Sequence, residues 1–234
     1  EGIEAKELFN LSGGSVQIYA ADDAVNAGYS RDSIQEKQQM GIDTSGMVAD
    51  AGEIIISGGE LYAYSTSNDA IDANGTITIS GGFCVAVGMS APEGGFDCDE
   101  NTFSVTGGTL IGIGGTHSRP TESATTQPCV ITSGLSFKAD QDYILKGDNE
   151  ILTYKAVRTY SGASLLISSP SFKKGGSYTF GTTSISCSAD TWVTGTTSSG
   201  GMVGPGGGGT PPDGPGGGGT PPDGPGGGGT PPGF

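Results

Sequence analysis

A pair of adjacent glycines with alternating apolar residues on both sides recurs along the first half of the chain, and it constrains the fold more than any other feature. The pairs stand at positions 13–14, 58–59, 81–82 and 107–108, at intervals of 45, 23 and 26 residues. Self-similarity at a period of this size is typical of repeat architectures. The repeating unit is therefore a coil of about 23 residues, with one extra segment in the first interval.

Alignment on the glycine pairs places residues of the same kind in columns. The residues two and four places before each pair are apolar, and the alternation resumes after it. A third short segment follows, with Val25, Ile71 and Phe96 in one column. A period of two predicts strands with one buried face. Because one coil cannot bury its own apolar residues, the coils must stack. We therefore predict an all-β fold, a right-handed parallel β-helix (a solenoid), over residues 1–127. An antiparallel sandwich with turns at the glycines is the alternative, but it would not require the columns to agree.

The chain divides into three parts, which are residues 1–127, 128–203 and 204–234. Within the first part, residues 29–52 interrupt the coils as an insertion, predicted as a loop or short helix. Residues 128–203 contain strand-like runs between turn residues, and we expect a C-terminal antiparallel β layer that packs on the last coils. An outward column that changes from Tyr62 to Val85 and Ile111 favours such a cover. Residues 204–234 repeat Gly, Pro, Thr and Asp, with Phe234 as the final residue, which predicts a polyproline II spacer or, if ordered, an assembly element.

Composition limits the classes of partner and compartment. The chain has 10 basic and 25 acidic residues and a net charge of −15, so nucleic acid is not an expected partner. No apolar run is long enough to span a membrane. The 45 glycines and few charged residues favour an extracellular β protein. Ile3 and Ala5 already fit the third segment, so we infer a processed or truncated chain that is exported to the extracellular space or cell surface by a signal upstream.

Carboxylates and asparagines close each coil. In the alignment Glu4, Asn26, Asp72 and Asp97 share one outward column. Neighbouring strands lie about 4.8 Å apart, and carboxylates at that spacing repel one another unless a cation lies between them. Hard oxygen ligands suit calcium. The alternative is that these residues only hydrogen-bond their own backbone in turns.

Other side chains carry weaker signals. Tyr19, Tyr62 and Tyr64 point outward and could act as sugar platforms, or they could lie under the cover layer. His117 is alone in a polar loop without a nucleophile, so we predict a surface histidine and no catalytic residue. Four cysteines lack zinc-site spacing, and buried thiols and a disulfide both remain open.

Several motifs resemble the carbohydrate-binding β-helix family of bacterial surface proteins, which bind pectin and are similar to polysaccharide lyases. They are Asp-Asp-Ala-Val-Asn-Ala at 22–27, Asp-Ala-Ile-Asp-Ala-Asn-Gly-Thr-Ile-Thr-Ile-Ser-Gly-Gly at 69–82, and Phe-Ser-Val-Thr-Gly-Gly-Thr-Leu-Ile-Gly at 103–112. The resemblance implies a calcium-binding β-helix that binds acidic polysaccharide without catalysis. The ligands that it implies are Asp22, Asp23, Asp69, Asp72, Asp97 and Asp99. Gly94 departs from the pattern, because it stands where Asp23 and Asp69 stand in the earlier coils.

Two other functions stay open at this point. The chain could be a structural subunit of an extracellular filament or matrix, built as a homo-oligomer by coil stacking and ordered Gly/Pro tails. A pectate-lyase-like enzyme is the least favoured reading, because the sequence offers no clear base beside the carboxylates.

Overall fold

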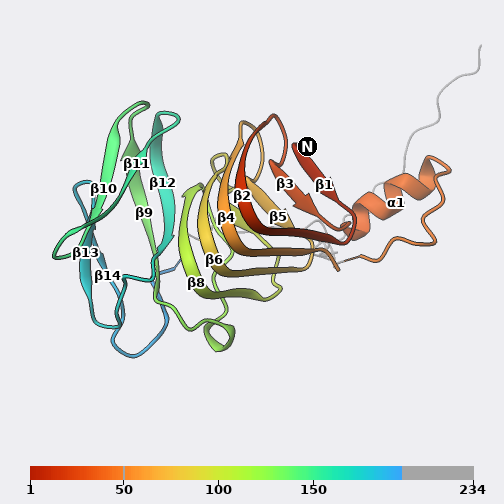
Figure 1. Cartoon of the computed structure of the whole chain (residues 1–234). Helices are drawn as coiled ribbons and strands as arrows, with labels where there is room; N and C mark the ends of the chain where they lie inside the picture. Colours follow the sequence, from red (N-terminus) through yellow and green to blue (C-terminus); the bar gives the residue numbers. More distant parts are fainter. Residues whose placement is uncertain (50, 197–234) are drawn as a thin grey trace, which may run out of the picture. The chain divides into compact units, whose positions relative to one another are not determined.

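The computed structural model describes residues 1–49 and 51–196, which lie within one compact unit, Glu1–Met202. The fold is mostly β, with largely parallel sheets and one antiparallel sheet (Figure 1). The predicted tail at 204–234 lies outside the described residues, as do the last residues of the predicted C-terminal region.

Two parallel sheets carry the repeat. The short third segments form a four-stranded sheet in the order β1 (Ile3–Ala5), β3 (Val25–Ala27), β5 (Ile71–Ala73) and β7 (Phe96–Asp97). The segments around the glycine pairs form long parallel strands, which are β2 (Leu8–Ala20), β4 (Glu53–Ser65), β6 (Thr76–Val87) and β8 (Phe103–Gly114). Along the chain the strands alternate between the two sheets, so that each coil adds one strand to each sheet.

The pairing register follows the sequence columns. Val25 pairs with Ile71 and Ile71 with Phe96, and all three are fully buried. The inward residues of both sheets join in a single apolar cluster, which is the main core. Ile3 and Phe9, from the edge strands β1 and β2, are only partly buried against it.

The glycine pairs are corners within the long strands. The second glycine of each pair has a positive φ, for example 77° at Gly82. A Cβ atom at Gly82 would lie 2.8 Å from the carbonyl oxygen of Gly59 on the neighbouring strand. Only glycine suits both this backbone conformation and the close approach of the coils, which explains why the pair recurs.

The C-terminal strands divide between two sheets. Three of them extend the long-strand sheet beyond β8, namely β12 (Tyr160–Ser168), β9 (Cys129–Phe137) and β15 (Val193–Thr194). Four others make a separate antiparallel sheet, namely β11 (Glu150–Lys155), β10 (Asp142–Lys146), β13 (Ser177–Phe180) and β14 (Thr183–Ser186). The expected antiparallel region is therefore present, but β12 pairs edge to edge with β8 instead of lying over it.

The antiparallel sheet covers the apolar outer face of the last coils. Val85 and Ile111 are at most 4% exposed and belong to a second apolar cluster with Leu145, Phe180 and Ile185. This second core holds the antiparallel sheet against β6 and β8. Tyr62 and Tyr64 on the outer face of β4 are only partly buried at the border of this core.

The insertion contains the helix α1 (Arg31–Gln39), whose residues are all at least partly exposed. The Ser30 hydroxyl caps it by accepting a hydrogen bond from the Ser33 amide at 3.1 Å. A 3-10 helix, η1 (Glu122–Ala124), follows the last coil. No helix in the described ranges has the length and apolarity needed to cross a membrane.

The prediction of a surface histidine was wrong. His117 is only 5% exposed. Its Nδ1 accepts a hydrogen bond from the Gly95 amide at 3.2 Å, and its Nε2 lies 3.1 Å from the Ser164 carbonyl oxygen. Burial lowers the pKa of His117 to about 4. The polar loop sequence concealed this role because both partners are backbone groups distant in the chain. All four cysteines are buried free thiols.

Candidate functional site

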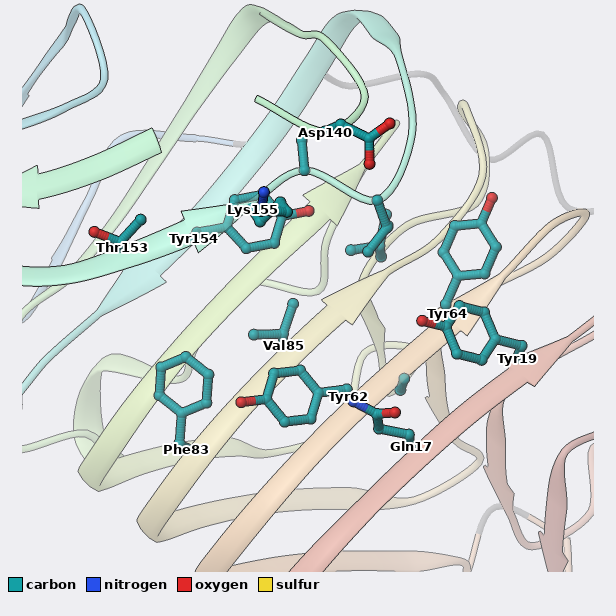
Figure 2. A pocket seen from close by; sticks show the side chains of 14 residues that line it. Gln17, Tyr19, Tyr62, Tyr64, Phe83, Val85, Asp140, Thr153, Tyr154 and Lys155 are labelled. Atoms are coloured by element: carbon teal, nitrogen blue, oxygen red, sulfur yellow. The ribbon is translucent and has the colours of Figure 1, made fainter. Parts of the chain in front are cut away.

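A cleft of about 360 Å³ lies between the outer face of the long-strand sheet and β11 (Figure 2). Strands β2, β4 and β6 supply one wall, and β11 with the residues after it supplies the other. The three tyrosines that the sequence singled out, Tyr19, Tyr62 and Tyr64, all line this cleft.

The strand register explains why the tyrosines converge. Tyr19 pairs with Tyr64 on the next strand, and Tyr62 occupies the adjacent outward position of the same strand. The ring centroids of Tyr19 and Tyr64 are 5.5 Å apart. Tyr62 lies 5.8 Å from the ring of Phe83. Tyr19 is 68% exposed, so its ring is the one most open to a ligand.

A few polar side chains complete the cleft. Gln17 lies beside the tyrosines, whereas Asp140, Thr153 and Lys155 come from the opposite wall. The Lys155 ammonium is 3.7 Å from a carboxylate oxygen of Asp142 in an exposed ion pair, which contributes little to stability. An aromatic surface with a few convergent polar groups is the usual composition of a small-ligand site.

Part of this lining could not be found from the repeat. Phe83 pairs with Glu60, so the alignment of the coils could have identified it as a residue near the tyrosines. Tyr154 and Lys155 belong to β11, which lies outside the repeat, and no column relates them to the tyrosines. Their place in the cleft depends on how the antiparallel sheet packs.

Two of the predicted metal ligands form a ladder of hydrogen bonds from one coil to the next. The Oδ1 atom of Asp23 accepts a bond from the Asp69 amide at 3.1 Å, and Oδ1 of Asp69 accepts one from the Gly94 amide at 2.5 Å. Both carboxylates are buried, with at most 7% exposure. The ladder ends at Gly94 because that residue has no side chain to continue it. These bonds join successive coils, 46 and 25 residues apart in the chain, so they are not the local turn bonds that the sequence left open.

Asp97 and Asp99 form the corresponding turn of the last coil. Oδ1 of Asp97 accepts hydrogen bonds from the Asp99 amide at 2.9 Å and from the Ser118 hydroxyl at 2.7 Å. Asp99 is exposed and has a φ of 51°, a conformation that Asp tolerates better than most residues. Turn chemistry therefore accounts for the positions of both residues.

A group of three carboxylates lies at the first turn. Glu1, Asp22 and Asp23 each offer an oxygen atom, and these atoms all lie within 4.8 Å of one another. Asp22 also accepts a hydrogen bond from Asn68 Nδ2 at 3.0 Å. Glu1 was not predicted, although it stands two residues before β1 as Asp23 stands before β3. Extending the column back to residue 1 would have found it.

The charges around this group are unfavourable without a cation. Burial first, and then the charges of Glu1 and Asp22, raise the pKa of Asp23 to about 7. Burial, with the charges of Asp23 and Asp97, raises the pKa of Asp72 to about 8. Burial, with the charge of Asp97, likewise raises the pKa of Asp69. Each shift reflects the cost of an ionised group among other carboxylates.

The donor set fits calcium. Glu1, Asp22 and Asp23 offer hard oxygen atoms within reach of one another, which calcium prefers. Asp72 is a further carboxylate whose pKa is raised partly by the charges of Asp23 and Glu1. The buried Oδ1 atom of Asn26, in the neighbouring strand, has no hydrogen-bond partner and is a further neutral oxygen. We refer to these five residues as the acidic edge. Of the predicted ligands, Asp69, Asp97 and Asp99 lie outside this set.

A charge-removing variant should test the acidic edge. Asp72→Asn keeps an acceptor for the side-chain Nδ2 of Asn74, which donates to Asp72 at 3.2 Å. In chelator at pH 8 we expect it to raise the free energy of unfolding by about 1 kcal/mol, because a buried charge is removed. With calcium present it should instead lose part of the stabilisation by the metal. Urea unfolding followed by Trp192 fluorescence would measure both effects, with the exposed Asp148→Asn as control. Equal changes in the free energy of unfolding of the two variants would contradict the assignment of Asp72 to the acidic edge.

No family model, curated protein or solved structure matches the chain. The family resemblance of the repeat motifs therefore stays a prediction.

Proposed function

We propose that this chain is a non-catalytic, calcium-binding protein of the extracellular space or cell surface that binds acidic, pectin-like polysaccharide. The fold within this proposal is a right-handed parallel β-helix, in which the first coils carry the acidic edge and strands β2, β4 and β6 carry one wall of the cleft. The alternation of strands between two parallel sheets supports that description.

The observation that carries the proposal is the convergence of Tyr19, Tyr62 and Tyr64 on one cleft. Tyrosine presents a flat apolar face and a polar hydroxyl, and this combination suits the apolar face and hydroxyl groups of a pyranose ring. The three rings come from two neighbouring strands whose spacing of about 4.8 Å is close to the length of one sugar unit. A polymer that crosses the strands would therefore meet successive rings.

The acidic edge supports the choice of an acidic polymer. A protein with a net charge of −15 repels a polyuronate unless a cation intervenes. Calcium bound there would neutralise protein carboxylates and offer open coordination positions to carboxylates of the polymer. The residues that would hold it are Glu1, Asp22, Asp23 and Asp72.

Retention on immobilised polygalacturonate tests the proposal. We expect binding in calcium, loss of binding in chelator, and no product that absorbs in the ultraviolet as an unsaturated uronate does. A neutral polymer such as dextran is the control matrix. Retention that is the same on both matrices, or absent in calcium, would contradict the proposal, and an unsaturated product would favour the lyase reading.

The cleft can be tested by a single substitution. Tyr19→Ala should weaken polysaccharide binding about tenfold, since it removes the most exposed ring of the cleft. Leu8→Ala is the matched control, because Leu8 is a 49% exposed apolar residue on the same strand but does not line the cleft. Affinity electrophoresis would compare the two variants. Equal retention of Tyr19→Ala and the parent protein would exclude the cleft as the sugar site.

A filament subunit is the second candidate. Strands β1 and β2 lie at the edges of their sheets within the described residues, and an edge strand offers hydrogen-bonding groups to another chain. Sedimentation velocity over a range of concentrations without sugar tests this. Particles that lengthen with concentration would favour assembly, whereas a constant sedimentation coefficient would contradict it.

A further inference from the structure

Four side chains make a row of contacts beside the cleft. The guanidinium carbon of Arg158 lies 4.8 Å from the ring centroid of Tyr160 and 5.5 Å from that of Tyr64. The Tyr64 ring in turn lies 5.5 Å from Tyr19. The row thus runs from β12 through the loop after β11 to β4 and β2, and it ends on the most exposed ring of the cleft.

Two backbone carbonyl groups fix the position of the Arg158 guanidinium. It donates to the carbonyl oxygens of Gly88 and, at 3.5 Å, of Ser65. Ser65 ends β4 and Gly88 follows β6. One residue of the β11–β12 loop therefore links the wall of the cleft to the ends of two strands that carry its floor.

The arrangement separates the roles of the three tyrosines. The guanidinium lies over the Tyr64 ring, so Tyr64 is occupied by a protein contact, whereas Tyr19 is open to solvent. An arginine placed over an aromatic face fixes that ring by electrostatic attraction and by its planar shape. Fixing a binding surface in advance reduces the entropy lost when a ligand binds.

We propose that Arg158 is a positioning residue for the sugar platform: it orients Tyr64, Tyr64 supports Tyr19, and the pyranose ring stacks on Tyr19. This inference rests on the proposed function. Arg158 itself does not contact the sugar, because its planar group is already engaged by two rings and two carbonyl groups.

A double-mutant cycle tests whether Arg158 acts through Tyr19. Arg158→Met keeps the length of the side chain and removes its charge and donors, and we expect it to weaken polygalacturonate binding about fivefold. In the Tyr19→Ala background the same substitution should change affinity by less than about twofold, since the platform is already lost. Isothermal titration calorimetry with polygalacturonate oligomers would supply all four affinities.

Arg119→Met is the matched control for lost arginine contacts. Arg119 also donates to two backbone carbonyl oxygens, those of Val193 and Gly195, and it does not line the cleft. It should lower the melting temperature as Arg158→Met does, yet leave affinity unchanged. Equal affinity losses in the two variants, or an additive cycle, would overturn the inference.

A readout without sugar keeps the inference separate from the proposed function. In aromatic NMR spectra, the ring signals of Tyr64 and Tyr19 should shift in Arg158→Met and stay in place in Arg119→Met. Unshifted signals would overturn the positioning role even if sugar binding were weakened. If the parent protein bound no polygalacturonate, the proposed function would fail, and the ring signals alone would decide whether Arg158 positions the tyrosines.

Discussion

In the presence of a calcium chelator, the free energy of unfolding should fall by about 3 kcal/mol between pH 6.5 and pH 8, and calcium should reduce this fall. The cause is the raised pKa of buried carboxyl groups, about 7 for Asp23 and about 8 for Asp72, with Asp69 shifted in the same direction. Water that reaches the half-buried Asp72 makes the expected loss smaller than the pKa values alone would give.

The direction of the effect follows from proton binding. In the unfolded chain these carboxyl groups are ionised above about pH 4, whereas the folded protein keeps them protonated up to their raised pKa. The stability that they contribute is therefore complete below pH 4 and is lost as the pH rises through 7 and 8. His117 acts in the opposite direction, because its pKa is lowered to about 4 and its contribution is lost as the pH falls below 6.5.

Denaturant unfolding at pH 6.5 and pH 8, with calcium and with chelator, measures the effect. The opposing contribution of His117 is small in this range, because the folded imidazole is neutral and the unfolded one is at most about half protonated at pH 6.5. A fall of equal size in both conditions would show that no cation relieves the acidic edge. A chelated protein whose stability does not change with pH would show that the carboxylates are not buried as described.

Replacement of Gly94 by alanine should cost at least about 3 kcal/mol, enough to prevent folding at moderate temperature. A Cβ atom there would lie 1.7 Å from the carbonyl oxygen of Thr116, with which Gly94 forms a parallel bridge. The contact is with backbone, so no side-chain rotation can relieve it. The last turn must shift, and with it the amide that Asp69 binds.

Gly13→Ala is the matched control, because a Cβ atom at Gly13 meets nothing within 4 Å and its φ is not positive. We expect it to change the free energy of unfolding by less than about 1 kcal/mol. Circular dichroism melting of both variants would compare them. If Gly94→Ala melted within a few degrees of the parent protein, the close approach of these two coils would be wrong.

The repeat predicted the parallel part of the fold to the level of residue pairing. The columns that contain Val25, Ile71 and Phe96 became paired strands with buried side chains. This was possible because stacked coils require equivalent residues to lie one above another, so that one alignment fixes both register and orientation. The C-terminal strands carry no such repeat, and their division between two sheets could not be predicted.

The candidate site was likewise predictable only where its residues belong to the repeat. Tyr19, Tyr62 and Tyr64 were identified as outward residues, and their positions line one cleft. Arg158 and Lys155 were not identified, since they come from the strand and loop that pack across the cleft. For the aspartates the sequence left two roles open. Asp97 makes a local turn bond to Asp99, whereas Asp69 binds the amide of Gly94 on the next coil, a role that the sequence did not predict.

Within the repeated coils, the sequence by itself determined which residues face inward, which strands pair and which glycines make the corners. These properties depend on local periodicity and on the repetition of one coil, both of which can be read along the chain. Only the tertiary structure decided that His117 is buried, that Gly94 has no room for a side chain and that Arg158 meets Tyr64. Those contacts join segments without a common period, and their energies depend on packing distances that no local pattern encodes.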